Sequence, residues 1–431
     1  MNSRFCRPFH FLLFMLLLGC SPTLYSQTIK RDSVVLGFNY QKEVFYSLRN
    51  GVSQVSNQSD WDLSHTTVSR DNCLRLNHAK GWELRQYPHG TVADWGKMDT
   101  SNWKQWPLFY NSTEDALLGA FNQTKNKANV WDFSWGVYNP NSHEVVGDSL
   151  FLLVFQGQPR YKFWPVVQKI NGDLVIRYQA FDGSPAITDT LLQKASPYRY
   201  HKYWGAEKGQ LNIEPEKWSW DLRFFQYFQP LWDSTNQQTI AYPVVGVQSA
   251  PHIRVMPIEG KTWQWAQDSF WAYSGPTQFS LSPIGYDWKF YDGQSSSYKM
   301  VPNRSYWIES DSQSALIRFV AFEGRSTGKI AFELMLASQI LGVESHSITL
   351  PLKGFPNPCS DVFHLPISGH LPLKIRLMNL ETGQWVHEQL VEKENLTSPY
   401  FTANFAHVPS GRYLLFCQQN EQIYSQLLYK N

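Results

Sequence analysis

The chain of 431 residues contains one pattern twice, and this repetition restricts its fold more than any other feature. The first copy has YSLRNG at 46–51, followed by Trp61-Asp62-Leu63. The second copy has WGAEKG at 204–209, followed by Trp220-Asp221-Leu222. An aromatic strand that ends in a Gly turn and leads into Trp-Asp-Leu therefore occurs in both halves. Such self-similarity indicates that a segment was duplicated.

Two later matches give the length of the repeat. Trp135, in FSWGVYN, corresponds to Trp288, in YDWKFYD, and Gly172 corresponds to Gly328. The offsets for Trp61, Trp135 and Gly172 are 159, 153 and 156 residues. A repeat of this length has the size of one domain. We therefore predict two copies of one domain, with equivalent tryptophans in equivalent places.

The Trp-Asp-Leu segments predict a specific local structure. Successive side chains along a strand point to opposite faces. We expect the rings of Trp61 and Trp220 to point inward, and Asp62 and Asp221 to face the other side. A short carboxylate there accepts hydrogen bonds from turn amides, so we favour a structural role over a catalytic one for both aspartates.

Composition and patterning predict an all-β chain. Short runs of alternating apolar and polar residues are separated by Gly-containing turns, which is typical of antiparallel strands with one buried face. Aromatic residues make up 16% of the chain and charged residues 17%, against about 25% charged in an average soluble domain. This composition excludes disorder for most of the chain. We expect a first module at 35–195, a second at 200–337, a linker at 338–351 and a C-terminal unit at 352–431.

The N-terminus predicts export. Arg4 and Arg7 precede an apolar run at 11–18 that is too short to span a bilayer, which is typical of a signal peptide covering residues 1–26. We favour cleavage after Ser26 over lipidation at Cys20, and the second alternative stays open. The expected location is outside the cell or at the extracellular face of the outer membrane.

Charge and motifs exclude two function classes. The chain has 38 Lys and Arg against 36 Asp and Glu, a net charge of +2, so it has no field that would attract nucleic acid. It also has no Gly-x-Ser-x-Gly elbow, no His-Glu-x-x-His pair, no phosphate-binding Gly loop and no calcium loop. We therefore expect a protein that is not an enzyme.

The C-terminal unit carries four landmarks in a fixed order. Pro356-Asn357-Pro358 opens it, a strand is expected at 375–380, Gly383 is expected in a hairpin turn, and Gly411 and Tyr413 lead into the last hairpin. Prolines fix an extended entry, and Gly permits a positive φ in the turn. This order resembles the type A sorting domain of type IX secretion cargo. The resemblance implies an Ig-like β-sandwich, the type IX secretion machinery as a partner, and removal of the domain with release or attachment to surface polysaccharide.

Three cysteines follow the leader: Cys73, Cys359 and Cys417. An exported chain meets an oxidising compartment, so Cys359 and Cys417 are candidates for a bridge. Three unpaired buried thiols are the equally weighted alternative, because sequence alone does not place Cα atoms within bridging distance.

The modules resemble the HmuY family of all-β haem-binding proteins. The second copy, 203–335, carries the resemblance most clearly, in YPVVGV at 242–247, SYKM at 297–300 and YWI at 306–308. The first copy, about 44–181, matches less well. The resemblance implies two tandem HmuY-like antiparallel β domains, haem as cofactor, and a role in haem or iron acquisition.

The resemblance also implies axial His or Met ligands on loops at one edge of the β-structure. Where the family has a histidine, this chain has Tyr291 in the second copy and Tyr138 in the first. The candidate haem ligands are therefore Tyr291, Tyr138, His252, Met256 and His143. Each also has a structural interpretation, such as a core position for Met256 and a solvated turn for His143.

The aromatic content supports an alternative function. Flat Trp faces stack on sugar rings, so a carbohydrate-binding, adhesion or structural surface protein that has lost haem ligation is the second hypothesis. The candidate stacking residues are Trp103, Trp106, Trp131, Trp263, Trp265 and Trp271. Most of them are expected to be core residues of two large β domains.

Overall fold

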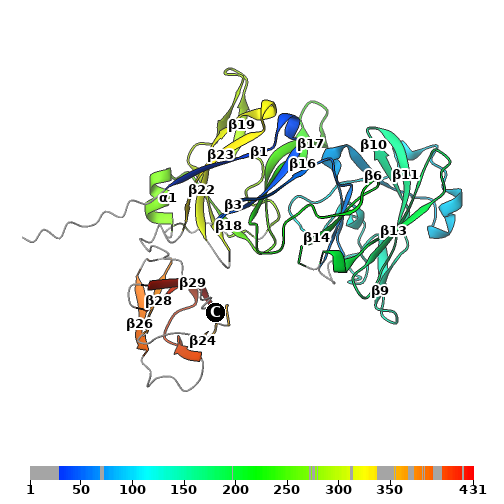
Figure 1. Ribbon diagram of the computed structural model, residues 1–431. Coiled ribbons are helices and arrows are strands. Elements are labelled where there is room, and N and C mark those ends of the chain that lie inside the picture. The colour runs from blue at the N-terminus through cyan, green and yellow to red at the C-terminus, as the bar shows by residue number, and fades with distance from the viewer. Residues whose placement is uncertain are drawn as a thin grey trace, which may run out of the picture.

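The computed structural model describes residues 29–67, 72–196, 198–270, 273, 277–278, 280–310, 314–336, 354, 356–366, 373–380, 382, 384–391, 400–419 and 422–431. Antiparallel strands make up most of these ranges, and the α-helix α1 (Trp263–Ser269) is short. The all-β prediction is confirmed. Figure 1 shows two β bodies side by side and a smaller C-terminal domain next to one of them.

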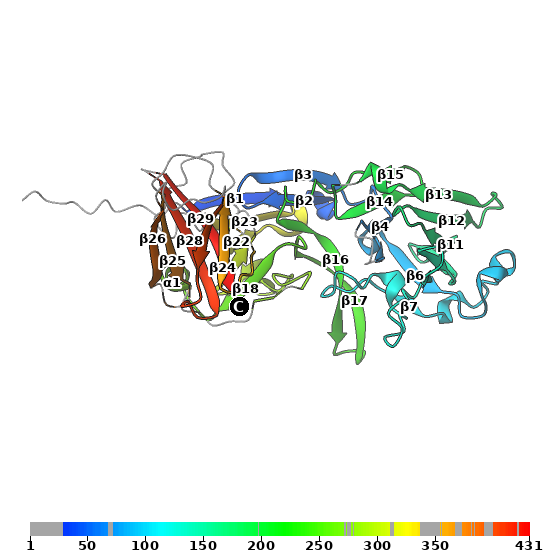
Figure 2. The same ribbon diagram turned by 90° about the horizontal axis from the view of Figure 1, so that it is seen from below.

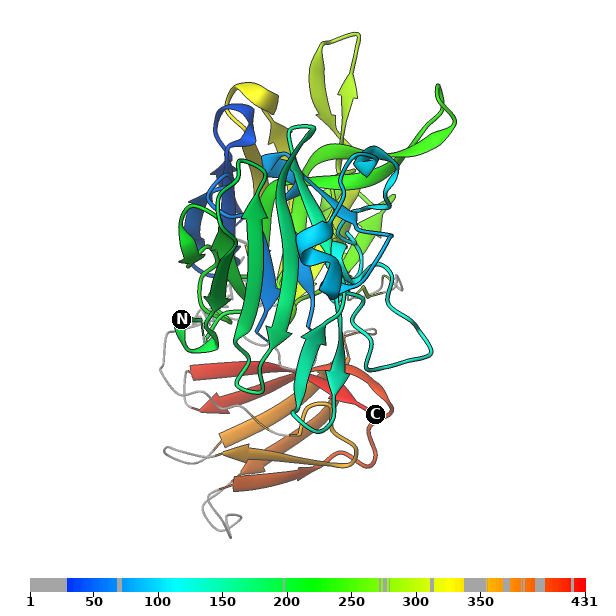
Figure 3. The same cartoon turned by 90° about the vertical axis from the view of Figure 1, so that its right-hand side faces the viewer.

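The first body is a pair of sheets. The smaller sheet has four strands, in the order β15 (Gly209–Leu211), β14 (His201–Gly205), β4 (Leu63–Thr66), β5 (Leu74–Leu76). The larger sheet runs β13 (Ile187–Leu191), β12 (Leu174–Ala180), β11 (Gln158–Gln168), β10 (Phe151–Phe155), β6 (Trp82–Gln86), β7 (Leu108–Phe109), with the hairpin β8 (Gly136–Asn139) and β9 (Glu144–Gly147) attached to β11. Figure 3 views the molecule from this side.

The second body has the same two sheets. Its smaller sheet is β3 (Gly51–Asn57), β2 (Lys42–Ser47), β16 (Leu222–Asp233), β17 (Gln238–Ser249), and its larger sheet is β1 (Lys30–Val35), β23 (Lys329–Leu336), β22 (Ala315–Phe322), β21 (Arg304–Glu309), β18 (Arg254–Glu259). A separate hairpin, β19 (Lys289–Asp292) with β20 (Ser297–Met300), corresponds to β8 and β9. The strand orders of the two bodies match except for β7, which extends the larger sheet of the first body, and this match supports the predicted duplication. Both larger sheets also have a bulge at the same place, after Pro165 in β11 and after Phe319 in β22.

Each repeat gives its first three strands to the body of the other repeat. β1, β2 and β3 of the first repeat pair with β23 and β16 of the second repeat. Conversely, β13, β14 and β15 of the second repeat pair with β12 and β4 of the first. The registers match, because Tyr46 faces Leu222 as Trp204 faces Leu63. The repeats are therefore exchanged around a pseudo-two-fold axis, as in a domain-swapped pair.

The exchange corrects the predicted module boundaries. Residues 35–195 and 200–337 are not two separate bodies, because residues 30–57 lie in the second body and residues 187–211 in the first. Alternation predicts where the strands are, but it does not predict which strands pair. The repeat in the sequence therefore does not coincide with one body of the structure.

The Trp-Asp-Leu segments hold the exchanged strands in place. The backbone amide of Asp62 donates to Trp204 O, and that of Asp221 donates to Tyr46 O, both at 2.8 Å. The carboxylate of Asp62 accepts from the amide of Ala206 (2.8 Å), and that of Asp221 accepts from the amide of Leu48 (2.7 Å). The predicted bonding of turn amides is confirmed, but each aspartate bonds a turn of the other repeat.

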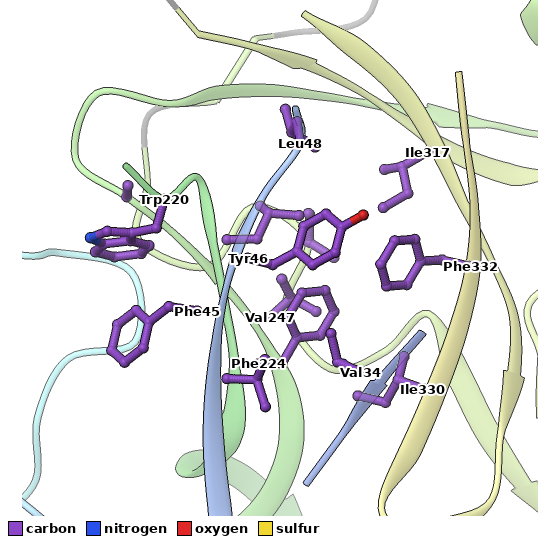
Figure 4. Packing of buried hydrophobic residues seen from close by; sticks show 14 of the residues in the cluster. Val34, Phe45, Tyr46, Leu48, Trp220, Phe224, Val247, Ile317, Ile330 and Phe332 are labelled. Atoms are coloured by element: carbon purple, nitrogen blue, oxygen red, sulfur yellow. The ribbon is translucent and has the colours of Figure 1, made fainter. Parts of the chain in front are cut away.

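Aromatic packing repeats the same exchange. Trp61 packs edge-on against Tyr203, with ring centroids 5.1 Å apart, and Trp220 packs in the same way against Phe45 at 5.0 Å. Both tryptophans are buried, as predicted. Trp135 and Trp288 are also fully buried, in the cores of the first and second bodies respectively. Figure 4 shows Trp220 beside Phe45 at the edge of the second core, with its nitrogen on the side away from Phe332.

The larger sheets have a second apolar layer on their outer faces. Leu152 and Val154 of β10 pack outward against Met98 and Trp106, which explains why β10 (FLLVF) is apolar on both faces. In the second body α1 covers the outer face of β18 and β21. The hairpin of β16 and β17 is far longer than its counterpart β4 and β5, and its end projects from the molecule in Figure 2.

The C-terminal domain is a two-sheet sandwich. One sheet pairs β24 (Val362–Pro366) with β27 (Tyr400–Asn404), and the other runs β26 (Trp385–Val391), β25 (Leu373–Asn379), β28 (Gly411–Gln419), β29 (Gln422–Lys430). It contacts the second body through Tyr429, whose hydroxyl donates to the Glu309 carboxylate at 2.7 Å, while the Arg254 guanidinium lies 4.3 Å from the Tyr429 ring centre. Glu309 is buried and also accepts from Trp307 Nε1 at 2.9 Å.

The residues of the predicted sorting motif contact the last strands of this domain. The side chain of Asn357 donates to Leu427 O (2.7 Å) and accepts from the Tyr429 amide (2.9 Å). The Tyr413 hydroxyl donates to Pro409 O at 2.7 Å from a fully buried position. Pro358 follows a cis peptide bond, Pro356 is exposed and Gly411 begins β28.

The cysteines that follow the leader are all buried and unpaired. Cys359 and Cys417 lie in the core of the C-terminal domain without a bond between them, so the structure has the second of the two predicted alternatives. The predicted signal peptide with Cys20, the linker at 338–351, Gly383 and Trp271 lie outside the described residues. Within the described ranges, no helix is long and apolar enough to cross a membrane.

Candidate functional site

A cleft of about 200 Å³ lies between the two bodies. Strands β4 and β5 and residues 111–117 of the first body form one side, and β16 and β17 form the other. The exchanged strand β14 adds His201 and Tyr203. Seven aromatic side chains are shared between the walls: Trp61, Tyr200, Tyr203, Trp220, Phe225, Tyr227 and Phe228.

The cleft lies on the pseudo-two-fold axis, because its walls are formed by equivalent positions. The register matches Trp61 with Trp220, Ser64 with Arg223, Thr66 with Phe225, Leu76 with Ser249 and Arg75 with Gln248. All ten of these residues line the cleft or its mouth. One member of several pairs is polar or charged where the other is not. The cleft is therefore symmetric in its backbone and asymmetric in its side chains.

A buried ion pair forms one part of the wall. Glu43 is fully buried and accepts from Trp61 Nε1 (2.9 Å) and from Arg223 Nε (2.8 Å) and Nη2. Burial raises the pKa of Glu43, although both partners oppose this shift. The Arg223 guanidinium lies 4.1 Å from the Phe225 ring centre. These contacts fix the two aromatic rings and neutralise the arginine.

A second pair joins His201 of the exchanged strand β14 to Glu214, which follows β15. Glu214 is buried and accepts from the backbone amide of His201 (2.7 Å), lies 2.9 Å from His201 Nδ1, and accepts from the Tyr203 hydroxyl (3.3 Å). Burial also raises the pKa of the Tyr203 hydroxyl well above its ordinary value, so it stays a hydrogen-bond donor. These contacts hold the Tyr203 ring against Trp61.

The first body contributes a neutral histidine. His78 Nδ1 lies 2.9 Å from Trp82 O, and the Asn111 amide donates to His78 Nε2 at 3.4 Å. Burial lowers the pKa of His78 to about 4, so its ring is uncharged at neutral pH. Phe228 of the second body stacks on Tyr110 with a centroid distance of 6.2 Å and closes this end of the cleft.

Four buried polar atoms of the cleft lining lack a hydrogen-bond partner within the described structure. They are Thr66 Oγ1 in the first body, and Trp220 Nε1, Tyr227 Oη and Ser249 Oγ in the second. Each residue is at least 93% buried. An unpaired buried polar group costs about 1–3 kcal/mol, so each of these atoms destabilises the protein as long as it has no partner.

The size of the cleft limits its ligand. Pockets for drug-sized ligands hold roughly 300–1,000 Å³, so a cleft of about 200 Å³ has the size for a single small ring. Among the described residues no group of three or more His, Cys, Asp or Glu is placed to hold a metal ion.

The five predicted haem ligands do not converge on one site. Tyr138 and His143 come together at the β8–β9 hairpin, where the Tyr138 hydroxyl lies 2.7 Å from His143 Nδ1 and the ring stacks on Trp131 at 4.7 Å. Tyr291, on β19, is exposed and contacts Tyr298 edge-on. These two hairpins belong to different bodies.

His252 and Met256 have structural contacts. His252 Nδ1 lies 2.8 Å from the Tyr200 hydroxyl, and its Nε2 lies 3.5 Å from Asp221, so both ring nitrogens have polar neighbours. Met256 is not in a loop, as the sequence suggested, but on β18, where it packs against Trp307 in the outer layer. Because Met256 closely follows Pro251 in the sequence, the residue pattern alone does not distinguish a strand position from a loop position there.

Of the predicted sugar-stacking tryptophans described here, Trp131 is exposed and Trp106 is buried. Trp103, Trp263 and Trp265 are partly buried at the outer apolar layers. None of them lines the cleft. The sequence predicts that the cleft residues Trp61 and Trp220 belong to the core. Their recurrence next to an aspartate is the signal in the sequence that indicates a site. Comparisons with family models, curated proteins and solved structures found no match.

Proposed function

We propose that the protein is an exported binding protein, without catalytic activity, that holds a sugar unit of a larger glycan in the cleft between its two bodies. The observation that carries the proposal is the set of unpaired buried atoms among aromatic rings: Thr66 Oγ1, Trp220 Nε1, Tyr227 Oη and Ser249 Oγ. Sugars combine hydroxyl groups, which bond such atoms, with apolar C–H faces, which pack on aromatic rings. The cleft has the size for one such ring.

Export by the type IX pathway, with display at the cell surface or release, is part of the same proposal. It is supported by the leader pattern and by the order of the C-terminal motifs, in which Asn357 and Tyr413 make the contacts that hold the last strands. A protein at that location meets polysaccharide of its own surface and of its surroundings.

The test is a titration of the protein with methyl glycosides of glucose, galactose and mannose, followed by tryptophan fluorescence. Trp220→Phe keeps an aromatic ring and removes one donor, so it should weaken binding about tenfold or less, as expected for one lost hydrogen bond. Trp288→Phe is the matched control, because its indole nitrogen is also unpaired but lies outside the cleft. The proposal fails if no glycoside binds, or if Trp220→Phe binds as well as the wild type.

Haem binding at the β8–β9 hairpin is the second candidate. It is favoured by the hydrogen bond between Tyr138 and His143, because an imidazole that takes the phenol proton allows tyrosine to bind ferric iron. Titration with hemin should then give a Soret shift that Tyr138→Phe abolishes and Tyr291→Phe leaves unchanged. Absence of a shift in the wild type would remove this candidate.

A further inference from the structure

We infer that the cleft selects an acidic sugar, a hexuronic acid unit, and that Arg75 is the residue that binds its carboxylate. The inference rests on the proposed function and adds the chemical class of its ligand. It is drawn from the charge balance of the cleft lining and from the chemical difference between the two sides of the pseudo-two-fold axis.

Arg75 is the cation of the lining without a neutralising partner. Its guanidinium donates to the backbone carbonyls of Ala116 (3.1 Å), Asp115 (3.4 Å) and Ser112. Carbonyl oxygens orient a guanidinium but carry no net charge. No carboxylate in the described part of the chain forms an ion pair with Arg75, whereas Arg223 pairs with Glu43. One end of the cleft therefore has a cation without an ion-pair partner, whereas the buried carboxylate of the lining, Glu214, lies beside His201 on the exchanged strand.

The charge of Arg75 acts on a neighbouring side chain of the cleft, His78. Arg75 contributes, after burial, to the lowered pKa of His78, because a positive charge opposes protonation of the imidazole. His78 lines the cleft, so the positive potential of Arg75 reaches it. The carboxylate of Asp115 accepts from the Leu117 amide (2.8 Å) and is exposed. A carboxylate supplied by a ligand would gain a charge-assisted hydrogen bond from a guanidinium that is already fixed.

The equivalent position across the axis is neutral. Gln248 faces Arg223 on β17 as Arg75 faces Ser64 on β5, and both Gln248 and Arg75 line the cleft. The next position in each pair is Leu76 in the first body and Ser249, with its unpaired hydroxyl, in the second. One end of the cleft thus offers a cation, and the other offers an amide and a hydroxyl. A ring with a carboxylate at one end and hydroxyl groups along the other matches this polarity.

The experiment is calorimetric titration with two matched pairs of probes: methyl β-D-glucuronide against methyl β-D-glucoside, and methyl α-D-galacturonide against methyl α-D-galactoside. In at least one pair the acidic member should bind about tenfold more tightly at low salt. This preference should shrink when sodium chloride is added, because salt screens a partly exposed charge. Arg75→Met should abolish the preference.

Arg75→Met also removes contacts to the loop at 112–116, so a second variant keeps the test decisive. Gln248→Glu places a negative charge at the opposite end without touching that loop, and it should weaken binding of the acidic member of each pair more than binding of the neutral member, so that the preference falls. Equal affinity for both members of each pair in the wild type, without salt dependence, overturns the inference and leaves the proposed function standing. If neither member of any pair binds, both fail.

Discussion

The two bodies have the same strand order but different interiors. At three buried positions the first body has His65, Lys202 and Gln168, and the register places Phe224, Val44 and Phe322 at the equivalent positions of the second body. Burial lowers the pKa of Lys202 to about 8 and that of His65 well below its ordinary value. One interior is apolar at these points, and the other holds ionisable groups in the same fold.

Because the two bodies share one fold in spite of these differences, the fold depends on the features that both repeats retain. The retained elements are the alternation of the strands, the bulges and the Asp contacts to the exchanged turns. Polar side chains can replace apolar ones inside when a partner is near, as Lys202 donates to Gly172 O. Such groups reduce stability unless they are fully bonded, and both ring nitrogens of His65 lack partners within the described structure. The first body should therefore be the less stable and the more sensitive to pH.

The largest expected effect concerns the aspartates that hold the exchange. Asp62 accepts from Lys80 Nζ (2.6 Å), Trp82 Nε1 (2.6 Å) and the Ala206 amide. Asp62→Ala should lower the free energy of unfolding by about 3 kcal/mol, because it leaves a partly buried cation and an indole donor unpaired. Asp221→Ala removes mainly the bond to the Leu48 amide and should cost about 1–2 kcal/mol. Urea unfolding followed by fluorescence measures both, and equal costs would contradict the comparison.

Acid should affect the first body more than the second. His65 and His78 are neutral in the folded state because burial lowers both pKa values, that of His78 to about 4. Their folded pKa values lie below the unfolded value near 6.5, so only the unfolded chain takes up protons between about pH 6.5 and 4, and stability falls as pH falls. At pH 5 each histidine should cost about 2 kcal/mol relative to pH 7.

His65→Phe introduces the residue of the second body, Phe224, at the equivalent position. The variant should lose about half of the acid effect of the two histidines, measured as the difference in the free energy of urea unfolding between pH 7 and pH 5. His143→Phe is the matched control, because His143 is exposed and should leave the pH dependence unchanged. A wild-type acid dependence retained in His65→Phe would show that His65 is not the cause.

Much of the repeat architecture could be predicted from the sequence. The offsets between Trp61 and Trp220 and between Trp135 and Trp288 correspond to equivalent buried places, and the aspartate after each first tryptophan bonds turn amides. Periodicity records which face of a strand is buried, and this information is local. The exchange of β1–β3 for β13–β15 cannot be predicted from such local information. Exchanged and unexchanged strands would bury the same faces with the same register, so the pattern along the chain is the same in both cases.

The site was harder to predict than the fold. Thr66, Arg75 and Ser249 are ordinary strand residues in the sequence, and they become a site only because two bodies bring them together on the axis. The resemblance to haem-binding proteins predicts Met256 and His252 as haem ligands. In the structure, apolar packing holds the Met256 side chain, and Asp221 lies beside the His252 side chain. A pattern along the chain records the residues of one strand, whereas the cleft is formed by strands from both repeats.

The second body also differs from the first in contacting the C-terminal domain, and this contact can be measured with thiols. Tyr429→Phe removes the hydrogen bond to the buried Glu309 carboxylate and keeps the ring under Arg254. A hydrogen bond to a charged group contributes more than about 1.4 kcal/mol to stability. Its loss should make opening of the C-terminal domain about tenfold more favourable, so Cys359 and Cys417 should react with a thiol reagent about tenfold faster. Cys73, buried in the first body, is the internal control. Unchanged labelling of Cys359 and Cys417 would show that the contact does not stabilise the domain.

The smallest expected effect distinguishes the two equivalent tryptophans of the cores. Trp135 Nε1 donates to Asn72 O at 3.0 Å, whereas Trp288 Nε1 has no partner within the described structure. Lys289 Nζ lies 4.1 Å from the Trp288 ring centre, but burial lowers the pKa of Lys289 to about 7. Above pH 8 this lysine is mostly neutral in the folded protein, so its attraction to the ring is small. At pH 8.5, Trp135→Phe should therefore cost about 1 kcal/mol more than Trp288→Phe in urea unfolding. Both substitutions remove the same atoms from fully buried places. A larger loss of unfolding free energy in Trp288→Phe would therefore mean that packing, and not the hydrogen bond, causes the difference between the two cores.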